Sequence, residues 1–128
     1  MKTKILSLLI ALVSIGTILH AESYVVDSGY CGAGEDSTAL RWEFSSDGTL
    51  SISGNGAMRD FQDSTELPWQ HYRIYEIRHI YLSEGITHIG SRAFESMQAV
   101  DTIAVPQSVK SIGSGAFLSN NLQTLVLQ

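Results

Sequence analysis

Few side chains in this 128-residue sequence could carry out chemistry, and their spacing favours no particular reaction. Cys31 is the only cysteine, so no disulfide can form within the chain. A nucleophilic thiol needs His and Asn or Asp partners in an electropositive setting, and the surrounding SGYCGAG carries no such signature. Cys31 is therefore predicted to be a small buried apolar residue.

The histidines do not form a recognisable metal site. His71, His79 and His88 are separated by 8 and 9 residues, which matches no metal-ligand template. We expect them to be solvated and well separated. Acidic residues are dispersed through turn segments such as GEDS and SSDG, and neither segment has the spacing of a calcium loop. The sequence predicts no cofactor, no metal and no catalytic residues, and an enzyme, most plausibly a hydrolase, ranks as a third alternative.

The first residues have the pattern of an export signal. Lys2 and Lys4 precede an uncharged, largely apolar run from Ile5 to Leu19, which is followed by the small residue Ala21. The run is shorter than the roughly 20 residues needed to span a bilayer. Residues 1–21 are therefore predicted to be a signal peptide that is cleaved, with an uncleaved membrane anchor as the alternative.

Cleavage after Ala21 would leave an acidic protein. Six basic residues would remain against 13 acidic ones, for a net charge of −7. Nucleic acids and anionic membrane surfaces demand a basic patch, so both are unfavourable partners. We expect an exported protein at the cell surface or outside the cell, with the periplasm as an alternative destination and no stable membrane span after cleavage.

A phrase near the middle of the chain recurs at a fixed distance. EGITHIGSRAF returns as QSVKSIGSGAF, and every equivalent apolar position is 23 residues further on. The first copy comprises Ile77, Ile80, Leu82, Ile86, Ile89, Gly90, Ala93 and Phe94. A third copy starts at Leu122, where one residue has been dropped around LSNN. A period in the twenties is the mark of stacked coils that share an apolar interior.

The elements within and before the repeat are predicted to be strands. IRHIYL, VDTIAV and LQTLVL each end on an alternating apolar pattern, which is typical of a half-buried strand. Upstream, ALRWEF and TLSISG alternate about the turn SSDG, which predicts a β-hairpin with Gly48 at positive φ. This hairpin is suited to cap the first coil. Gly90 and Gly113 suit a positive φ or a close backbone approach.

The repeats resemble the BspA-like, or Treponema pallidum-type, leucine-rich repeat family. The resemblance rests on IGSRAF and IGSGAF after a strand and turn, and on DGTLSISGNGAM followed by PW upstream. Met97 and the Asn120–Asn121 pair stand where that family usually has a cysteine. The resemblance implies a mainly β fold with short turns or helices, namely a leucine-rich-repeat solenoid of two to three coils capped N-terminally by the β-hairpin. It divides the chain into a signal peptide (1–21), a capping region (22–76) and repeats (77–128), the last coil incomplete.

Outward strand residues are the candidate binding surface. They are His79, Tyr81, Thr102, Ala104, Thr124 and Val126, and the alternative is that they are ordinary exposed strand residues. The family resemblance implies an exported, non-enzymatic protein for protein–protein interaction or adhesion, with a host extracellular-matrix or cell-surface protein as partner. The first alternative is a carbohydrate-binding module that uses Trp69, Tyr72 or Tyr81 as stacking platforms. The second is a structural fragment of a larger surface protein.

Overall fold

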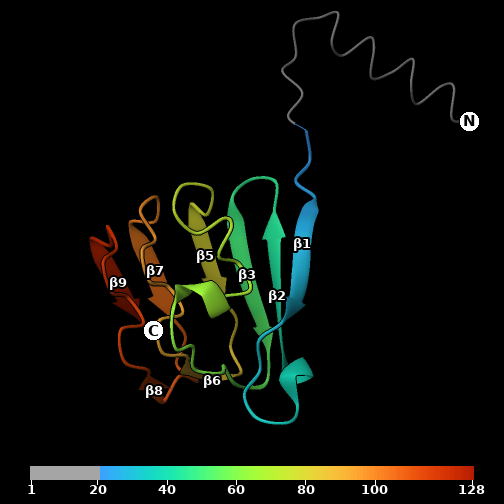
Figure 1. Cartoon of the computed structure of the whole chain (residues 1–128), viewed down its shortest axis with the longest axis vertical. Coiled ribbons are helices and arrows are strands. Elements are labelled where there is room, and N and C mark those ends of the chain that lie inside the picture. Colours follow the sequence, from blue (N-terminus) through green and yellow to red (C-terminus); the bar gives the residue numbers. More distant parts are fainter. Residues whose placement is uncertain (1–20) are drawn as a thin grey trace, which may run out of the picture.

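The computed structural model describes residues 21–128, and the chain in this range is mainly β (Figure 1). The predicted signal peptide therefore lies almost entirely outside the described residues. The strands are β1 (Val25–Tyr30), β2 (Leu40–Ser45), β3 (Thr49–Gly54), β4 (Gly56–Ala57), β5 (His79–Leu82), β6 (Ile86–Ile89), β7 (Thr102–Val105), β8 (Ser111–Ile112) and β9 (Thr124–Leu127). Two short 3-10 helices, η1 (Ser37–Ala39) and η2 (Ser64–Glu66), complete the regular structure of this range.

The predicted hairpin is present as β2 and β3. The two strands pair antiparallel with Trp42 opposite Ile52, and both of these side chains face the core. Asp47 shapes the turn because its Oδ1 accepts the Thr49 N–H at 3.0 Å. Gly48 has φ +86°, a conformation that side chains with a Cβ rarely adopt. The turn SSDG thus fixes the register that buries one face of the hairpin.

The hairpin continues directly into the repeats. β3 pairs in parallel with β5, so that Leu50 lies opposite Ile80 and Ser51 opposite Tyr81. β1 adds an antiparallel strand on the other side, which gives a four-stranded sheet in the order β1-β2-β3-β5. The hairpin therefore joins the first repeat, as predicted, and it does so through the pairing of β3 with β5.

Residues one repeat apart lie side by side. In the second sheet, of order β4-β6-β8, His88 pairs with Ser111 and Ile89 with Ile112, both 23 residues apart. In the third, β7 and β9 pair in parallel with a spacing of 22 residues from Thr102 to Thr124. The shorter spacing agrees with the residue dropped around LSNN.

The strands on the front of the molecule form a row that is interrupted once. Figure 1 shows β7 beside β5, and the two strands contact one another. They nevertheless belong to separate sheets, because the ladder from β1 ends at β5 and a new ladder begins at β7. Ile80 and Ile103, both on paired strands, still point to the same interior.

The core is built around aromatic side chains. Trp69 is fully buried, meets Trp42 and Phe61 edge-on with centroids 5.9 Å away in each case, and stacks on Phe94 at 6.3 Å. Its indole Nε1–H donates to the Ala93 carbonyl oxygen at 3.0 Å, which satisfies the polar end of a buried ring. This cluster holds the domain together without a disulfide.

The repeated IGSxAF phrase is explained by close packing against an earlier segment of the chain. A Cβ at Gly90 would overlap the backbone carbonyl oxygen of Arg59, and one at Gly113 would overlap the backbone of Ser91. Close backbone approach, rather than positive φ, is therefore the reason for glycine at both positions. Phe94 and Phe117, which end the two copies, stack with centroids 5.8 Å apart.

The two outer edges of the strand row differ. β1 carries a bulge between Val25 and Asp27, which interrupts its ladder and places a carboxylate at the edge. β9 has the sequence TLVL, with no charge, proline or bulge, and all four of its residues are exposed. Charges and bulges discourage pairing with a further strand, so only the β1 edge is protected.

Candidate functional site

The outward side chains of the strand row form one continuous face. Pairing places Thr49 beside His79 and Ser51 beside Tyr81, while Thr102 lies beside Thr124. Ala104 lies beside Val126 in the same ladder. The sequence-predicted residues are thus brought together in two groups, one on β5 and one on β7 and β9.

These residues differ in how much surface they offer. Tyr81 is 59% exposed and Val126 40%, and they are the large hydrophobic side chains that the predicted set exposes. His79, Thr102 and Thr124 are exposed, whereas Ala104 is half-buried. None of the six carries a permanent charge, so a partner can cover them without stranding an unpaired ion.

The face extends further towards the N-terminus than the predicted residues. On β1 and β2, Arg41 forms an ion pair with Glu43 at 3.3 Å, donates to Ser28 Oγ at 3.1 Å and lies 6.0 Å over the Tyr30 ring. The alternation in ALRWEF predicts that Arg41 and Glu43 point outward. They share a face of the sheet with Tyr81 because β3 pairs with β5. The face therefore changes from charged and internally paired on β1–β2 to uncharged on β5–β9.

The sequence predicted a solvated His88 side chain, and for this residue the prediction is wrong. Its Nδ1 lies 2.7 Å from Ser111 Oγ and its Nε2 lies 2.9 Å from Asp60 Oδ1. The same Asp60 oxygen accepts the Ser91 N–H at 2.8 Å. The His88 hydrogen bond, followed by that of the Ser91 N–H, lowers the pKa of Asp60. The hydroxyl and the imidazole come from consecutive repeats and the carboxylate from the preceding region, so the group ties these three segments together.

The other residues considered for catalysis or metal binding show no such role in the described part of the chain. Cys31 is fully buried, and burial raises the pKa of its thiol to about 12, so the reactive thiolate is suppressed at neutral pH. Within residues 21–128, no cluster of three or more His, Cys, Asp or Glu side chains is arranged to hold a metal ion. Asn120 Oδ1 accepts the Leu122 N–H at 3.0 Å, the local turn bond expected beside the deletion.

Two of the three predicted stacking platforms are committed to the core. Trp69 as a platform for sugars is wrong, because the side chain is fully buried among other aromatic rings. Tyr72 stacks on Phe44 with centroids 4.3 Å apart and donates its hydroxyl to Asp27 Oδ2 at 3.1 Å. Burial, followed by that hydrogen bond, raises the pKa of Tyr72. Only Tyr81 keeps an exposed ring.

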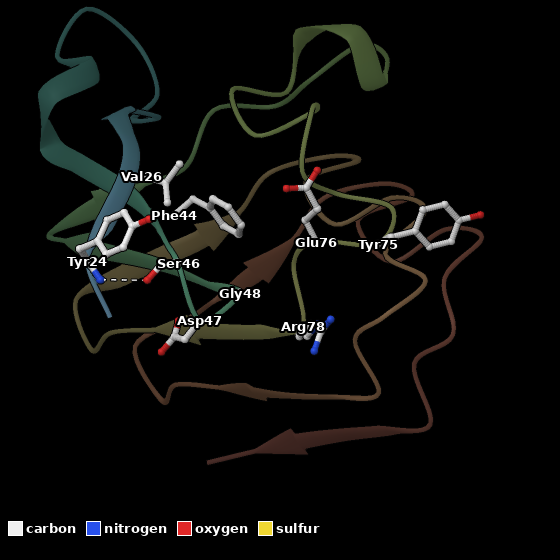
Figure 2. Close-up of a pocket in the computed structure, with 9 residues that line it drawn as sticks. All are labelled: Tyr24, Val26, Phe44, Ser46, Asp47, Gly48, Tyr75, Glu76 and Arg78. Atoms are coloured by element: carbon white, nitrogen blue, oxygen red, sulfur yellow. Dashed lines mark hydrogen bonds between the residues drawn. The ribbon is translucent and has the colours of Figure 1, made fainter. Parts of the chain in front are cut away.

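A pocket of about 530 Å³ lies apart from this face, at the hairpin turn (Figure 2). One wall is formed by Tyr24, Val26 and Phe44, and the facing side by Tyr75, Glu76 and Arg78. The turn residues from Ser46 to Gly48 close one side. The sequence did not predict this pocket, because nothing in VVDSGY indicates the bulge that displaces Val26.

Comparison with known proteins agrees with this architecture. Residues 67–128 match the family described as "BspA type Leucine rich repeat region (6 copies)". A leucine-rich repeat protein from Eubacterium ventriosum has a similar structure, with a TM-score of 0.68 and 31% sequence identity. The match covers 80% of this chain and 26% of that one, so the chain spans about a quarter of its neighbour's length. No curated protein matches the chain.

The mainly β architecture, the repeat register and this neighbour define the chain as a leucine-rich repeat protein. Proteins of this class typically present a surface to a protein partner. More narrowly, residues 67–128 belong to the BspA-type leucine-rich repeat family. The two short 3-10 helices of residues 21–128 are far too short to cross a bilayer.

Proposed function

We propose that this protein is exported and binds other proteins through the outward face of its strand row, without enzymatic activity. The observation that carries the proposal is the uncharged face of β5, β7 and β9, where Tyr81 and Val126 offer contact surface. Tyrosine is enriched at interfaces because it combines a large apolar ring with a hydrogen-bonding hydroxyl. The leucine-rich repeat class supports a protein rather than a small molecule as the partner.

Adhesion at the cell surface is the setting that we propose. The basic start and the apolar run of residues 1–21 support export, and the BspA type supports a surface or secreted destination. A host extracellular-matrix protein or a protein on a neighbouring cell is the partner. The acidic balance of the chain favours a partner with a neutral or basic contact surface.

We further propose that the 23-residue units are coils of a short solenoid. The pairings of His88 with Ser111 and of Ile89 with Ile112 support this, as does the stack of Phe94 on Phe117. In such an array each coil buries its apolar edge on its neighbours, and the terminal coil needs an atypical cap. Residues 22–76 supply that cap through β1–β3 on the N-terminal side of the two to three coils.

The binding proposal is tested with immobilised extracellular-matrix proteins and the purified chain. Tyr81→Ala removes an exposed ring from the centre of the face, and the loss of about 2 kcal/mol typical of an interface hot spot weakens binding about thirtyfold. His79→Ala is the second face variant. Leu118→Ala, which truncates a 48%-exposed apolar side chain outside the strand row, is the control. Binding that survives both face variants, or is lost equally in the control, removes the face from the proposal.

A further inference from the structure

The pocket at the hairpin turn has walls that are already fixed in place. Tyr24 and Ser46 exchange two hydrogen bonds, with the Tyr24 N–H donating to Ser46 Oγ at 3.1 Å and the Ser46 N–H to the Tyr24 carbonyl oxygen at 2.8 Å. On the other side, the N–H groups of Arg78 and His79 both donate to the Gly48 carbonyl oxygen, at 2.8 and 3.2 Å. These hydrogen bonds hold the backbone of both walls to one turn. Ligand binding therefore costs little conformational entropy for ordering that backbone.

The two walls have different chemistry. Tyr24, Val26 and Phe44 present aromatic and aliphatic carbon, and Phe44 is held flat against Tyr72 from behind. Figure 2 shows Glu76 and Arg78 on the facing side. Within residues 21–128, neither the Glu76 carboxylate nor the Arg78 guanidinium has a hydrogen-bond or ion-pair partner. The pocket thus pairs an apolar wall with a free acceptor and a free donor.

We propose that this pocket binds a neutral saccharide unit. A pyranose ring has an apolar C–H face that fits an aromatic wall, and its edge carries hydroxyl groups that both donate and accept. Glu76 accepts from one hydroxyl and Arg78 donates to another, so both charged side chains gain partners. Convergent polar groups opposite an apolar wall are the usual make-up of a small-molecule site.

The charges select against anionic ligands. An anion entering the pocket meets the carboxylates of Glu76 and Asp47, and Arg78 offsets only one of them. The net charge of −7 expected after signal cleavage adds to the repulsion of anionic sugars. A neutral polyol avoids this repulsion. This site is independent of the protein-binding face, which lies on the outward side of the strands.

The proposal is tested by nuclear magnetic resonance titration of the ¹⁵N-labelled protein. The probes are the methyl glycosides of glucose, galactose, mannose and N-acetylglucosamine, each raised to about 20 mM, which detects dissociation constants in the millimolar range. We expect at least one glycoside to shift the backbone amide signals of Gly48, Glu76 and Arg78 with saturation. Tyr24→Ala and Glu76→Ala each weaken that binding about tenfold, since the first removes part of the apolar wall and the second removes a hydrogen-bond acceptor.

Controls separate this site from its alternatives. Tyr81→Ala, on the outward face, leaves the glycoside titration unchanged. The zwitterionic dipeptide Gly-Phe offers an ammonium to Glu76 and a carboxylate to Arg78, and its binding in place of the glycosides would overturn the saccharide assignment. The proposal is equally overturned if no glycoside shifts the pocket amides, or if Tyr81→Ala weakens binding as much as Tyr24→Ala does.

Discussion

The stack of Phe94 on Phe117 gives a quantitative prediction about the repeats. The two residues occupy the same position in successive copies, yet their surroundings differ. Phe94 is fully buried with Trp69 on one side and Phe117 on the other, at centroid distances of 6.3 and 5.8 Å. Phe117 is half-buried. The same substitution should therefore reduce the free energy of unfolding more at Phe94 than at Phe117.

Phe94→Ala is expected to cost about 4 kcal/mol of unfolding free energy, because truncation of a buried Phe leaves a cavity that its neighbours fill only in part. Phe117→Ala should cost about 2 kcal/mol, since less of its area is removed from water. With a urea m-value of about 2 kcal/mol/M, the unfolding midpoint falls by about 2 M and about 1 M respectively.

The double variant measures the stack itself. A buried aromatic pair contributes about 1 kcal/mol beyond the area that it buries, so the two costs should fail to add by about that amount. Urea denaturation followed by tryptophan fluorescence reports on Trp69, which touches Phe94 directly. If Phe94→Ala does not fold, Phe94→Leu, with an expected cost of about 1.5 kcal/mol, serves in its place. Equal costs for the two positions, or full additivity in the double variant, would refute the stacked arrangement.

Three further predictions concern other parts of the fold. Gly90→Ala should cost about 3 kcal/mol because its Cβ would overlap the backbone carbonyl oxygen of Arg59. Gly115→Ala, whose Cβ would meet Arg92 and Leu118 only at ordinary van der Waals distances but at φ +67°, should cost only about 1 kcal/mol in the same denaturation assay. Cys31 should resist thiol reagents at pH 8 in the folded protein and react fully in denaturant, since its pKa is raised to about 12; rapid labelling of the native state would contradict its burial. The His88 hydrogen bond lowers the pKa of Asp60 below 3.8, so its stabilisation is present above that value and is lost as the pH falls through the folded pKa. Stability measured from pH 6 to pH 2 should therefore fall less steeply in Asp60→Asn than in the parent.

The repeat and the hairpin could be predicted because each is encoded by a local, periodic pattern. Apolar positions at a spacing of 23 predicted that Phe94 and Phe117 lie against one another, and the alternation about SSDG predicted that Gly48 adopts a positive φ. Burial of Cys31 was predicted because SGYCGAG carries no signature of a nucleophilic thiol, and the structure confirms it. These inferences needed only the chain's own period and the preferences of single residues.

Other features depended on contacts between distant segments. Trp69 was a candidate platform only in the alternative carbohydrate hypothesis, since nothing near LPWQHY indicates that Trp42, Phe61 and Phe94 surround it. His88 reaches Asp60 and Ser111, which are 28 residues before it and 23 after it. The second spacing equals the repeat period, so the coil register could have indicated that contact.

The candidate surfaces were predictable to different degrees. The outward face followed from strand alternation, although its continuation onto Arg41 and Glu43 required the parallel pairing of β3 with β5. The turn pocket could not be predicted, because it depends on a bulge at Val26 and on the path of residues 75–78 past the turn.

The unequal edges of the strand row set the direction in which this architecture can be engineered. The bulge and Asp27 on β1 block the addition of a strand on that side. β9 offers regular, uncharged backbone in the register of the coils before it. A designer could therefore lengthen the array by inserting whole 23-residue modules after Val105 without disturbing the turn pocket. Binding area would then grow by one strand per module while the cap stayed constant.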